Sequence, residues 1–158
     1  MYKDHYRALS AVFPIILKDV NGKKCILLHK RANTGYMDGM WDTAGSGHVD
    51  RGETATQAVV RECKEELGIR VEMCDVRFAH LSHNVDSCGE ETYYNIYFFI
   101  ERFEGTPHIM EPEKCDGLDW FVVDKLPENM IPVRRADILC GMGDVRYSEY
   151  VDERITEE

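Results

Sequence analysis

The sequence predicts an α+β fold in a single domain spanning residues 1–158. Segments typical of β-strands come before and after one long helical segment, and a second helical segment follows near the end of the chain. This order differs from the regular strand–helix alternation that builds βαβ units and a purely parallel sheet. A length of 158 residues is also sufficient for one hydrophobic core.

The first expected elements form a β-hairpin. Ser10–Leu17 is rich in apolar residues and predicts a strand, although Pro14 indicates a sheet edge or a bulge, because proline cannot donate to the strand ladder. Asn21-Gly22 is a two-residue turn whose members tolerate positive φ, and Lys24–His29 is the return strand. Ala32–Asp50 contains four glycines and predicts a long loop.

The strongest helical segment is Thr54–Leu67. Its apolar residues recur every four positions, at Ala55, Val59, Cys63 and Leu67, and Gly68 follows at the usual stop position. Three later segments predict strands: Val71–His80, Tyr94–Phe103 and Leu118–Val123. Val133–Cys140 predicts a second helix. The acidic end, from about residue 145 to residue 158, predicts a frayed tail.

Composition limits the possible partners and compartment. The net charge of −10 argues against binding of long nucleic acids, which is normally driven by basic surfaces. A small phosphorylated ligand remains compatible with it, because a bound cation can invert the local charge. No apolar run approaches the ~20 residues that span a bilayer, so we expect no membrane association. The six cysteines include no Cys-x-x-Cys pair, which is typical of reduced thiols in a cytoplasmic protein.

Three glutamates carry the candidate chemistry. Glu62, Glu65 and Glu66 are three or four residues apart or adjacent on the expected helix, so they share one helix face. Clustered carboxylates repel one another, and a hard divalent cation such as Mg²⁺ relieves that repulsion through oxygen ligands. Taken alone, the same pattern is also typical of a solvated helix face.

The surrounding residues favour the metal interpretation. Residues 47–69, GHVDRGETATQAVVRECKEELGI, fill every specified position of the Nudix box, G-x5-E-x7-R-E-U-x-E-E-x-G-U, in which U is a bulky apolar residue. A chance match in a chain of this length is on the order of one in 10⁵ or rarer. Outside the box, the chain resembles the MutT-like branch of the Nudix hydrolases at Trp41, at Glu101-Arg102-Phe103-Glu104-Gly105 and at Asp119-Trp120-Phe121. The resemblance to the Nudix hydrolases therefore covers roughly residues 10 to 135. The resemblance implies an α/β/α sandwich with a mixed sheet and a catalytic loop-helix-loop.

The resemblance also implies roles for residues of the box. Glu62 and Glu66, helped by Glu65, would bind Mg²⁺ or Mn²⁺, together with the carbonyl of Ser46 or Gly47. Glu62 or Glu65 would act as general base toward the attacking water. Arg61 would hold a carboxylate through bidentate hydrogen bonds, and Glu53 would brace Arg61 or the loop.

Three residues outside the box are further candidates. MutT-like enzymes often recruit a carboxylate from a distant loop, which counting from Glu101-Arg102 places at Glu111, with Glu113 nearby. Arg31, at the end of the second strand, is a candidate for the substrate phosphates, and Asn129 is a candidate for the base. An exposed acid, a solvated cation and a turn asparagine are the respective structural alternatives.

The implied reaction is hydrolysis of a nucleoside or deoxynucleoside triphosphate to the monophosphate and pyrophosphate. Residues typical of the ADP-ribose, dinucleoside polyphosphate, NADH and coenzyme A enzymes are missing, but another nucleoside-diphosphate-linked substrate and a non-catalytic nucleotide sensor stay open. The loop from Trp41 to Gly47 has the longer spacing of isopentenyl diphosphate isomerases, yet Ser46 replaces their catalytic cysteine. Ile131-Pro132-Val133-Arg134 differs from the Trp-Pro-Asp-Asp segment of the mammalian oxidised-purine enzyme, which argues against the same mode of base recognition. A homodimer is a further possibility.

Overall fold

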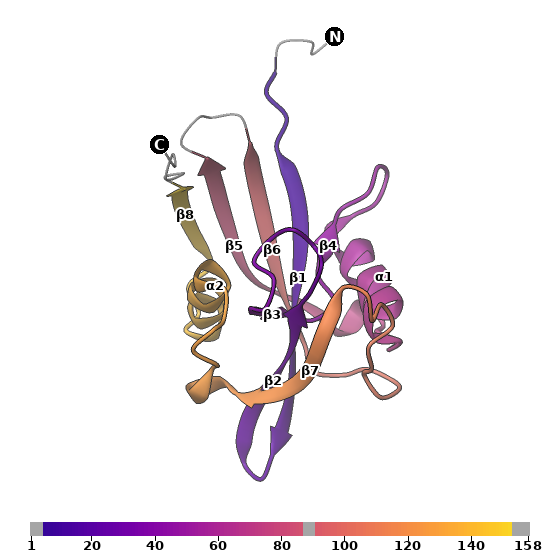
Figure 1. The fold of residues 1–158 in the computed structure, drawn as a ribbon. Coiled ribbons are helices and arrows are strands. Elements are labelled where there is room, and N and C mark those ends of the chain that lie inside the picture. The colour runs from indigo at the N-terminus through magenta and orange to yellow at the C-terminus, as the bar shows by residue number, and fades with distance from the viewer. Residues whose placement is uncertain (1–4, 87–90, 153–158) are drawn as a thin grey trace.

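A central β-sheet is covered by one helix on each face (Figure 1). The computed structural model describes residues 5–86 and 91–152. The helices are α1, Ala55–Leu67, and α2, Pro132–Met142. The strands of these ranges are β1 Leu9–Val20, β2 Lys23–Arg31, β3 Trp41–Thr43, β4 Gly47–His48, β5 Val76–Asp86, β6 Thr92–Ile100, β7 Cys115–Val122 and β8 Tyr147–Asp152. The α/β/α sandwich implied by the sequence is confirmed.

The sheet is mixed. Its main order is β3-β2-β1-β6-β5-β8, with β4 paired to β1 and β7 paired to β2. β1 runs parallel to β6, and β8 runs parallel to β5, whereas the other pairs are antiparallel. In the described part of the chain, no helix has the length and hydropathy needed to cross a membrane.

Strand β1 is at the centre of the sheet, so the edge position expected from Pro14 is wrong. β1 pairs with β4 at Ala11–Val12 and with β2 at Leu17–Val20, and its register with these two strands leaves Pro14 between them. On its other side Pro14 pairs in register with Phe98 of β6. The proline therefore lies where β1 changes partners, and this position tolerates the missing N–H donor.

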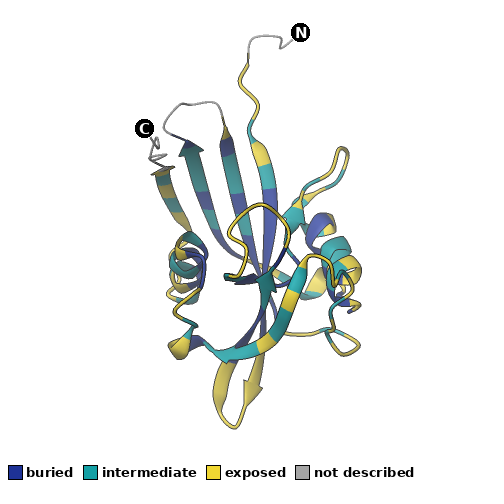
Figure 2. Ribbon diagram, in the orientation of Figure 1, coloured by how far each residue is buried: buried dark blue, intermediate teal, exposed yellow. Residues whose placement is uncertain are grey.

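Alternate residues of β1 pack on opposite faces of the sheet. Val12 and Ile16 join the core beneath α1, whereas Phe13 and Ile15 join the core beneath α2. Figure 2 shows this burial as dark blue along the central strands. Burial on both faces explains why β1 has a nearly continuous apolar sequence instead of an alternating one.

The predicted Asn21-Gly22 turn is confirmed, with φ values of 51° and 77°.

The helix of the box begins and ends as expected. The Thr54 hydroxyl accepts from Gln57 N–H, and the Gln57 side chain accepts from Thr54 N–H, which together form a capping box. Gly68 ends the helix in the left-handed conformation with φ of 65°. Val59, Cys63 and Leu67 are buried against the sheet. The opposite side of α1 therefore carries the charged residues.

Three sequence expectations about element boundaries are wrong. The segment Ala32–Asp50 is not entirely loop, because β3 and β4 add to the edges of β2 and β1. The strand expected at Val71–His80 is shifted to β5 at Val76–Asp86 and follows a 3₁₀ turn, η1, at Met73–Asp75. Residues 147–152 of the expected tail form β8, while residues 153–158 lie outside the described residues.

A buried polar network holds β8 against the sheet. His80 Nε2 lies 2.8 Å from Ser148 Oγ, and its Nδ1 lies 2.8 Å from the Val145 carbonyl. Asp137 of α2 accepts from Ser148 at 3.3 Å and from Ser82 at 2.6 Å. These contacts join residues at least 55 positions apart except for the Ser148–Asp137 pair. Local composition therefore gave no indication of β8.

Candidate active site

The box segment forms a loop-helix-loop beside the sheet. Pairing of Gly47 and His48 with Val12 and Ala11 fixes the first loop on β1. The Val49 N–H donates to the Ser10 carbonyl at 2.9 Å and extends this contact. α1 then packs through its apolar stripe on the face of the sheet that carries Val12 and Ile16. The charged face of the helix therefore lies beside the Gly47 loop.

Arg61 connects the acidic residues of this face. Its guanidinium binds both oxygens of Glu53, from Nε at 2.9 Å and from Nη2 at 3.0 Å. Nη1 donates to Glu62 at 2.7 Å and to Glu65 at 3.1 Å. Nη2 also donates to the His48 carbonyl at 3.0 Å. These hydrogen bonds tie α1 to both halves of the preceding loop.

Hydrogen bonds from Arg61 lower the pKa of Glu53, which favours the carboxylate form of its bidentate partner. The contacts expected for Arg61 and Glu53 are thus present in the structure. Their catalytic roles remain predictions.

Gly47 permits a close approach between the loop and the Glu62 carboxylate. A Cβ atom at this position would lie 2.1 Å from Glu62 Oε1, far inside van der Waals distance. The side chain of Glu62 is only 12% exposed, whereas that of Glu65 is 57% exposed. Glycine here therefore leaves the space that the Glu62 carboxylate occupies, and its φ is not positive.

Glu66 is the most strongly perturbed carboxyl group of the site. One of its oxygens accepts a hydrogen bond from Gly45 N–H at 3.1 Å. Burial, reinforced by the negative charges of Glu62 and Glu111, raises its pKa to about 8. Burial also raises the pKa of Glu62, against the opposing effect of Arg61. The carboxylates of this site are thus under electrostatic strain that a cation would relieve.

Glu111 reaches the same site from a distant loop. The Met110 N–H donates to the Glu66 carbonyl at 3.1 Å, and the His108 N–H donates to the Leu67 carbonyl at 3.1 Å. These bonds attach the loop to the carboxyl end of α1. The Lys114 ammonium lies 3.1 Å from Glu111 Oε1. Glu111 therefore lies near the glutamates of α1, and its role as a metal ligand or base stays a prediction.

The glutamates line one open cleft of about 330 Å³. Its lining combines six of the expected residues with three others that sequence reasoning missed: Ser46, Gly47, His48, Asp50, Glu62, Glu65, Glu66, Glu111 and Lys114. Asp50 and His48 lie inside the box, at positions where the motif specifies no residue type. Lys114 is three residues beyond Glu111, and this spacing was the available signal for it.

The family model for the NUDIX domain matches residues 9–140, which is most of the chain. The chain is a Nudix hydrolase. The complete box, the sandwich fold and the acidic cleft beside α1 are all consistent with membership in this family.

Individual relatives place the hydrolase in the MutT-like branch. It is 30% identical over 123 residues to an oxidized purine nucleoside triphosphate hydrolase of Danio rerio, covering 75% of this chain and 70% of the relative. It is 31% identical over 127 residues to a putative 8-oxo-dGTP diphosphatase of Bacillus subtilis, covering 80% and 74%. A MutT Nudix hydrolase of Burkholderia pseudomallei superimposes with a TM-score of 0.73 at 27% identity, covering 89% of this chain and 99% of that structure.

An isopentenyl-diphosphate Delta-isomerase of Serratia proteamaculans is also similar, with 28% identity over 122 residues, covering 76% of this chain and 65% of the relative. The residues of the cleft argue against isomerase activity in this hydrolase. Ser46 lines the cleft where that interpretation requires a cysteine, and the glutamates of the box converge there. The chemistry of the site thus favours hydrolysis over isomerisation.

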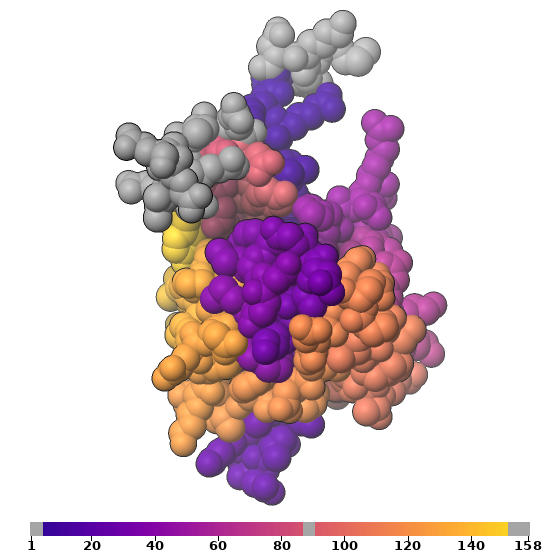
Figure 3. Space-filling model, in the orientation of Figure 1, coloured from indigo at the N-terminus to yellow at the C-terminus, as the bar shows by residue number. Residues whose placement is uncertain are grey.

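Four candidates of this hydrolase lie outside the lining of the acidic cleft: Arg61 and Glu53, which are hydrogen-bonded to each other, and Arg31 and Asn129. Arg31 donates to the Tyr36 carbonyl at 2.8 Å and to Thr34 at 3.1 Å. The Asn129 side chain donates to the Gly39 carbonyl at 3.2 Å. Both residues therefore hold the loop of residues 32–40, which covers the centre of the face shown in Figure 3. Their contact with substrate remains a prediction.

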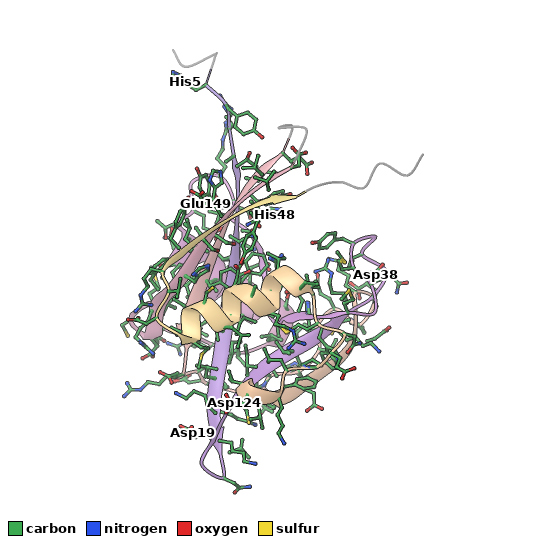
Figure 4. All side chains as sticks on the ribbon, turned by 90° about the vertical axis from the view of Figure 1, so that its left-hand side faces the viewer. His5, Asp19, Asp38, His48, Asp124 and Glu149 are labelled. Atoms are coloured by element: carbon green, nitrogen blue, oxygen red, sulfur yellow. The ribbon has the colours of Figure 1, made fainter. Side chains whose placement is uncertain are left out.

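The same loop lies beyond one end of α2. Figure 4, drawn from the α2 side, shows this helix across the sheet and the loop bearing Asp38 past its end. Beneath it, the buried Arg134 donates to Asp42 at 3.1 Å and to Tyr97 at 3.2 Å. Asp42 also lies 3.4 Å from Arg31. Arg134 belongs to the segment Ile131-Pro132-Val133-Arg134, which stands where the mammalian oxidised-purine enzyme has Trp-Pro-Asp-Asp, and its side chain makes structural contacts.

The donor set of the Nudix cleft fits a hard divalent cation, the kind of metal that Nudix hydrolases generally use. All of its candidate ligands offer oxygen, and the close Gly47–Glu62 approach brings a backbone segment up to a carboxylate. Within residues 5–86 and 91–152, no three His, Cys, Asp or Glu side chains already converge as a metal site. Arg61 occupies one oxygen each of Glu62 and Glu65. Binding would therefore require side-chain rearrangement within the cleft.

Proposed function

We propose that this Nudix hydrolase cleaves a nucleoside or deoxynucleoside triphosphate to the monophosphate and pyrophosphate, and that it depends on Mg²⁺. The observation that carries the proposal is the acidic cleft, in which the glutamates of α1 and Glu111 from a distant loop line one open space of about 330 Å³. A cavity so acidic would repel a polyphosphate unless a cation were bound with it. The sandwich fold alone would not support this conclusion, because one fold hosts many functions.

The relatives support a nucleoside triphosphate as the substrate class. Two relatives are named for activity on oxidized purine nucleoside triphosphates or on 8-oxo-dGTP, and the similarity to this chain covers at least 70% of each of them. Oxidised purine nucleotides therefore belong among the first compounds to test. The segment Ile131-Pro132-Val133-Arg134 still argues that any such base is recognised differently from the mammalian enzyme.

The proposed reaction consumes one water. The water oxygen bonds to phosphorus at the α–β anhydride, the bridging P–O bond breaks, and the released pyrophosphate or monophosphate carries the bridging oxygen away. One proton is lost from the water, and Glu62 or Glu65 accepts it. Arg61 holds both carboxylates at the cleft through Nη1. Glu53 in turn fixes the guanidinium by a bidentate contact.

The residues that would hold Mg²⁺ are Glu62, Glu65, Glu66 and Glu111, together with the Gly47 or Ser46 carbonyl. When bound, the cation would neutralise phosphate charge and increase the acidity of a nearby water. Mn²⁺ shares the preference for oxygen ligands and is the natural substitute.

A nucleotide panel with and without Mg²⁺ tests the proposal. Canonical and oxidised dNTPs and NTPs are compared with ADP-ribose, NADH, coenzyme A and diadenosine polyphosphates, and both phosphate and pyrophosphate are measured. Magnesium-dependent pyrophosphate release from a triphosphate is the expected result. Preferential cleavage of a diphosphate-linked compound would show that the substrate is such a compound and not a nucleoside triphosphate. Folded protein that cleaves nothing would favour a nucleotide-sensing module.

A further inference from the structure

A histidine of β2 lies behind the acidic cleft. His29 pairs with Asp42 of β3 on one side and with Leu118 of β7 on the other. Two positions before it in β2, Leu27 packs in the core beneath α1. Because alternate residues of a strand share a face, the His29 side chain points toward the same side of the sheet as α1.

The Nε2 atom of His29 is buried without a hydrogen-bond partner among the described residues. Buried polar atoms of native proteins are nearly always paired, so an orphaned imidazole nitrogen needs an explanation. Desolvation by burial lowers the pKa of His29 and favours the neutral imidazole, which carries one ring N–H. This group therefore has a hydrogen-bonding capacity that its protein neighbours leave unused.

His29 lines a small cavity that adjoins the acidic cleft. The cavity has a volume of about 30 Å³ and is formed by His29, Glu66, Leu67, Ile109, Glu111, Lys114, Cys115 and Leu118. Glu66, Glu111 and Lys114 line both this cavity and the cleft. Two of the glutamates expected to bind the cation thus line both the cleft and the cavity that contains His29.

The size and chemistry of the cavity suit a single water. A volume of about 30 Å³ exceeds the ~10–15 Å³ that one water requires. A buried water also needs two to four polar partners, and His29, Glu66 and Glu111 supply them. A metal ion is a poorer occupant, because much of the cavity wall is apolar, formed by Leu67, Ile109 and Leu118.

We propose that His29 is a positioning residue of the active site, which holds the Glu66 and Glu111 carboxylates through one buried water. The His29 Nε2–H donates to the water oxygen, and the two water hydrogens are donated to the carboxylates. Gly45 N–H already fixes one oxygen of Glu66. The water contact restrains the carboxylate from a second side. The inference rests on the proposed function, because it assigns these carboxylates to cation binding.

Outer partners of metal ligands commonly change metal affinity by about 10–100-fold. His29→Phe fills the cavity and removes the donor, whereas His29→Gln keeps a side-chain N–H. We expect His29→Phe to weaken Mn²⁺ binding at least ~10-fold and His29→Gln to restore most of that loss. Ile109→Val is the matched control, since it alters an apolar wall of the same cavity and should leave Mn²⁺ affinity unchanged.

Mn²⁺ binding is measured by electron paramagnetic resonance of the free ion in the absence of nucleotide. Circular dichroism confirms that each variant is folded. The ¹⁵N resonances of the wild-type imidazole provide a second readout, with a protonated Nε2 and slow solvent exchange expected for His29. Equal Mn²⁺ affinity in wild type and His29→Phe, equal weakening in His29→Phe and His29→Gln, or a rapidly exchanging ring N–H would overturn the proposal. Because Mn²⁺ binding needs no turnover, a wild type that binds Mn²⁺ but hydrolyses no nucleotide would contradict the proposed function alone.

Discussion

At the residue scale, the cleft depends on a balance between Arg61 and the glutamates around it. The guanidinium contacts Glu53, Glu62 and Glu65, so removal of one acid redistributes hydrogen bonds among the others. Desolvation raises the pKa of Glu62, but the contact with Arg61 opposes that shift and favours the charged form. Glu62 is therefore a partly buried carboxylate whose charge is maintained by one neighbour.

Glu62→Gln tests whether that charge is catalytic. Glutamine preserves the size of the side chain and an oxygen for Arg61, so we expect an intact fold, whereas turnover should fall by ~10² or more because the base and ligand charge are lost. Steady-state pyrophosphate release and thermal unfolding measure the two effects. Full activity in a folded variant would contradict the role assigned to Glu62.

Gly47→Ala tests the close approach of the loop to Glu62. The new Cβ would lie 2.1 Å from Glu62 Oε1, at the far end of a flexible side chain, so the carboxylate should move while the backbone stays in place. Misplacement of a catalytic group by about 1 Å can cost ~100-fold in rate. Steady-state kinetics should show this loss with little change in melting temperature.

The double variant Gly47→Ala/Glu62→Gln provides the control for this interpretation. If the alanine acts through Glu62, the double variant should be little slower than Glu62→Gln alone, because coupled residues are not additive. A fully multiplicative loss would show that Gly47 acts independently of Glu62.

At the scale of elements, α1 and α2 are held by different means. α1 has a capping box, a left-handed glycine and an apolar stripe. α2 begins with proline and has no side-chain cap, but it carries the buried Arg134 and Asp137, which bond to residues of the sheet and its neighbouring strands. Both helices were predicted from the local sequence, the second at Val133–Cys140, but the packing of the second on the sheet also involves tertiary polar contacts.

Gly141→Ala should stabilise α2. A Cβ at this position would lie 3.5 Å from Ala79 Cβ and 3.6 Å from both His80 Cβ and Ile15 Cδ1, which are ordinary packing distances. Alanine also restricts the unfolded chain more than glycine does. We expect the free energy of unfolding to rise by about 0.5–1 kcal/mol in urea titrations. A decrease would show that α2 packs more tightly against β5 than these distances indicate.

At the scale of the whole molecule, the acidic cleft links folding to cation binding. The net charge of −10 already disfavours compaction, and the buried carboxylates add a local cost. A cation that binds only the folded state should raise stability according to its concentration relative to its dissociation constant. The site is therefore expected to be a weak point of the metal-free protein.

Glu66 gives this linkage a defined pH dependence. Its pKa is raised from 4.5 to about 8, so between these values the folded state retains a proton that the unfolded state has released. Its contribution to stability is therefore complete below about pH 4.5 and is lost as the pH rises through about 8. In chelator-treated protein, the melting temperature should fall more between pH 5 and pH 8.5 for wild type than for Glu66→Gln, on the order of a few degrees.

Mg²⁺ should raise the melting temperature of wild type more at the higher pH, because the cation favours the charged form of Glu66. Identical pH profiles for wild type and Glu66→Gln would contradict the assignment. The comparison between the two proteins removes the effect of the remaining charges, which titrate in both.

The sequence by itself determined the features that depend on near neighbours. The Asn21-Gly22 turn, the amphipathic helix with its Gly68 stop, and the position of the box carboxylates on one helix face follow from local dihedral preferences and helical periodicity. The resemblance of residues 47–69 to the Nudix box then indicated the sandwich and the site together. It also led to Glu111, although that residue is 45 positions beyond Glu66.

Only the tertiary structure decided the features that depend on distant pairing. Pro14 is accommodated in a central strand because β1 exchanges β4 for β2 at that point. Strand β8 joins the sheet by parallel pairing with β5, and His80 and Asp137 provide buried partners for its Ser148. Arg31 and Asn129 lie outside the cleft lining and donate to the loop of residues 32–40, an arrangement that only the tertiary structure revealed, and their contact with substrate stays a prediction. The physical reason is the same throughout: hydrogen-bond partners and burial are set by residues far apart in the chain, and no local pattern encodes them.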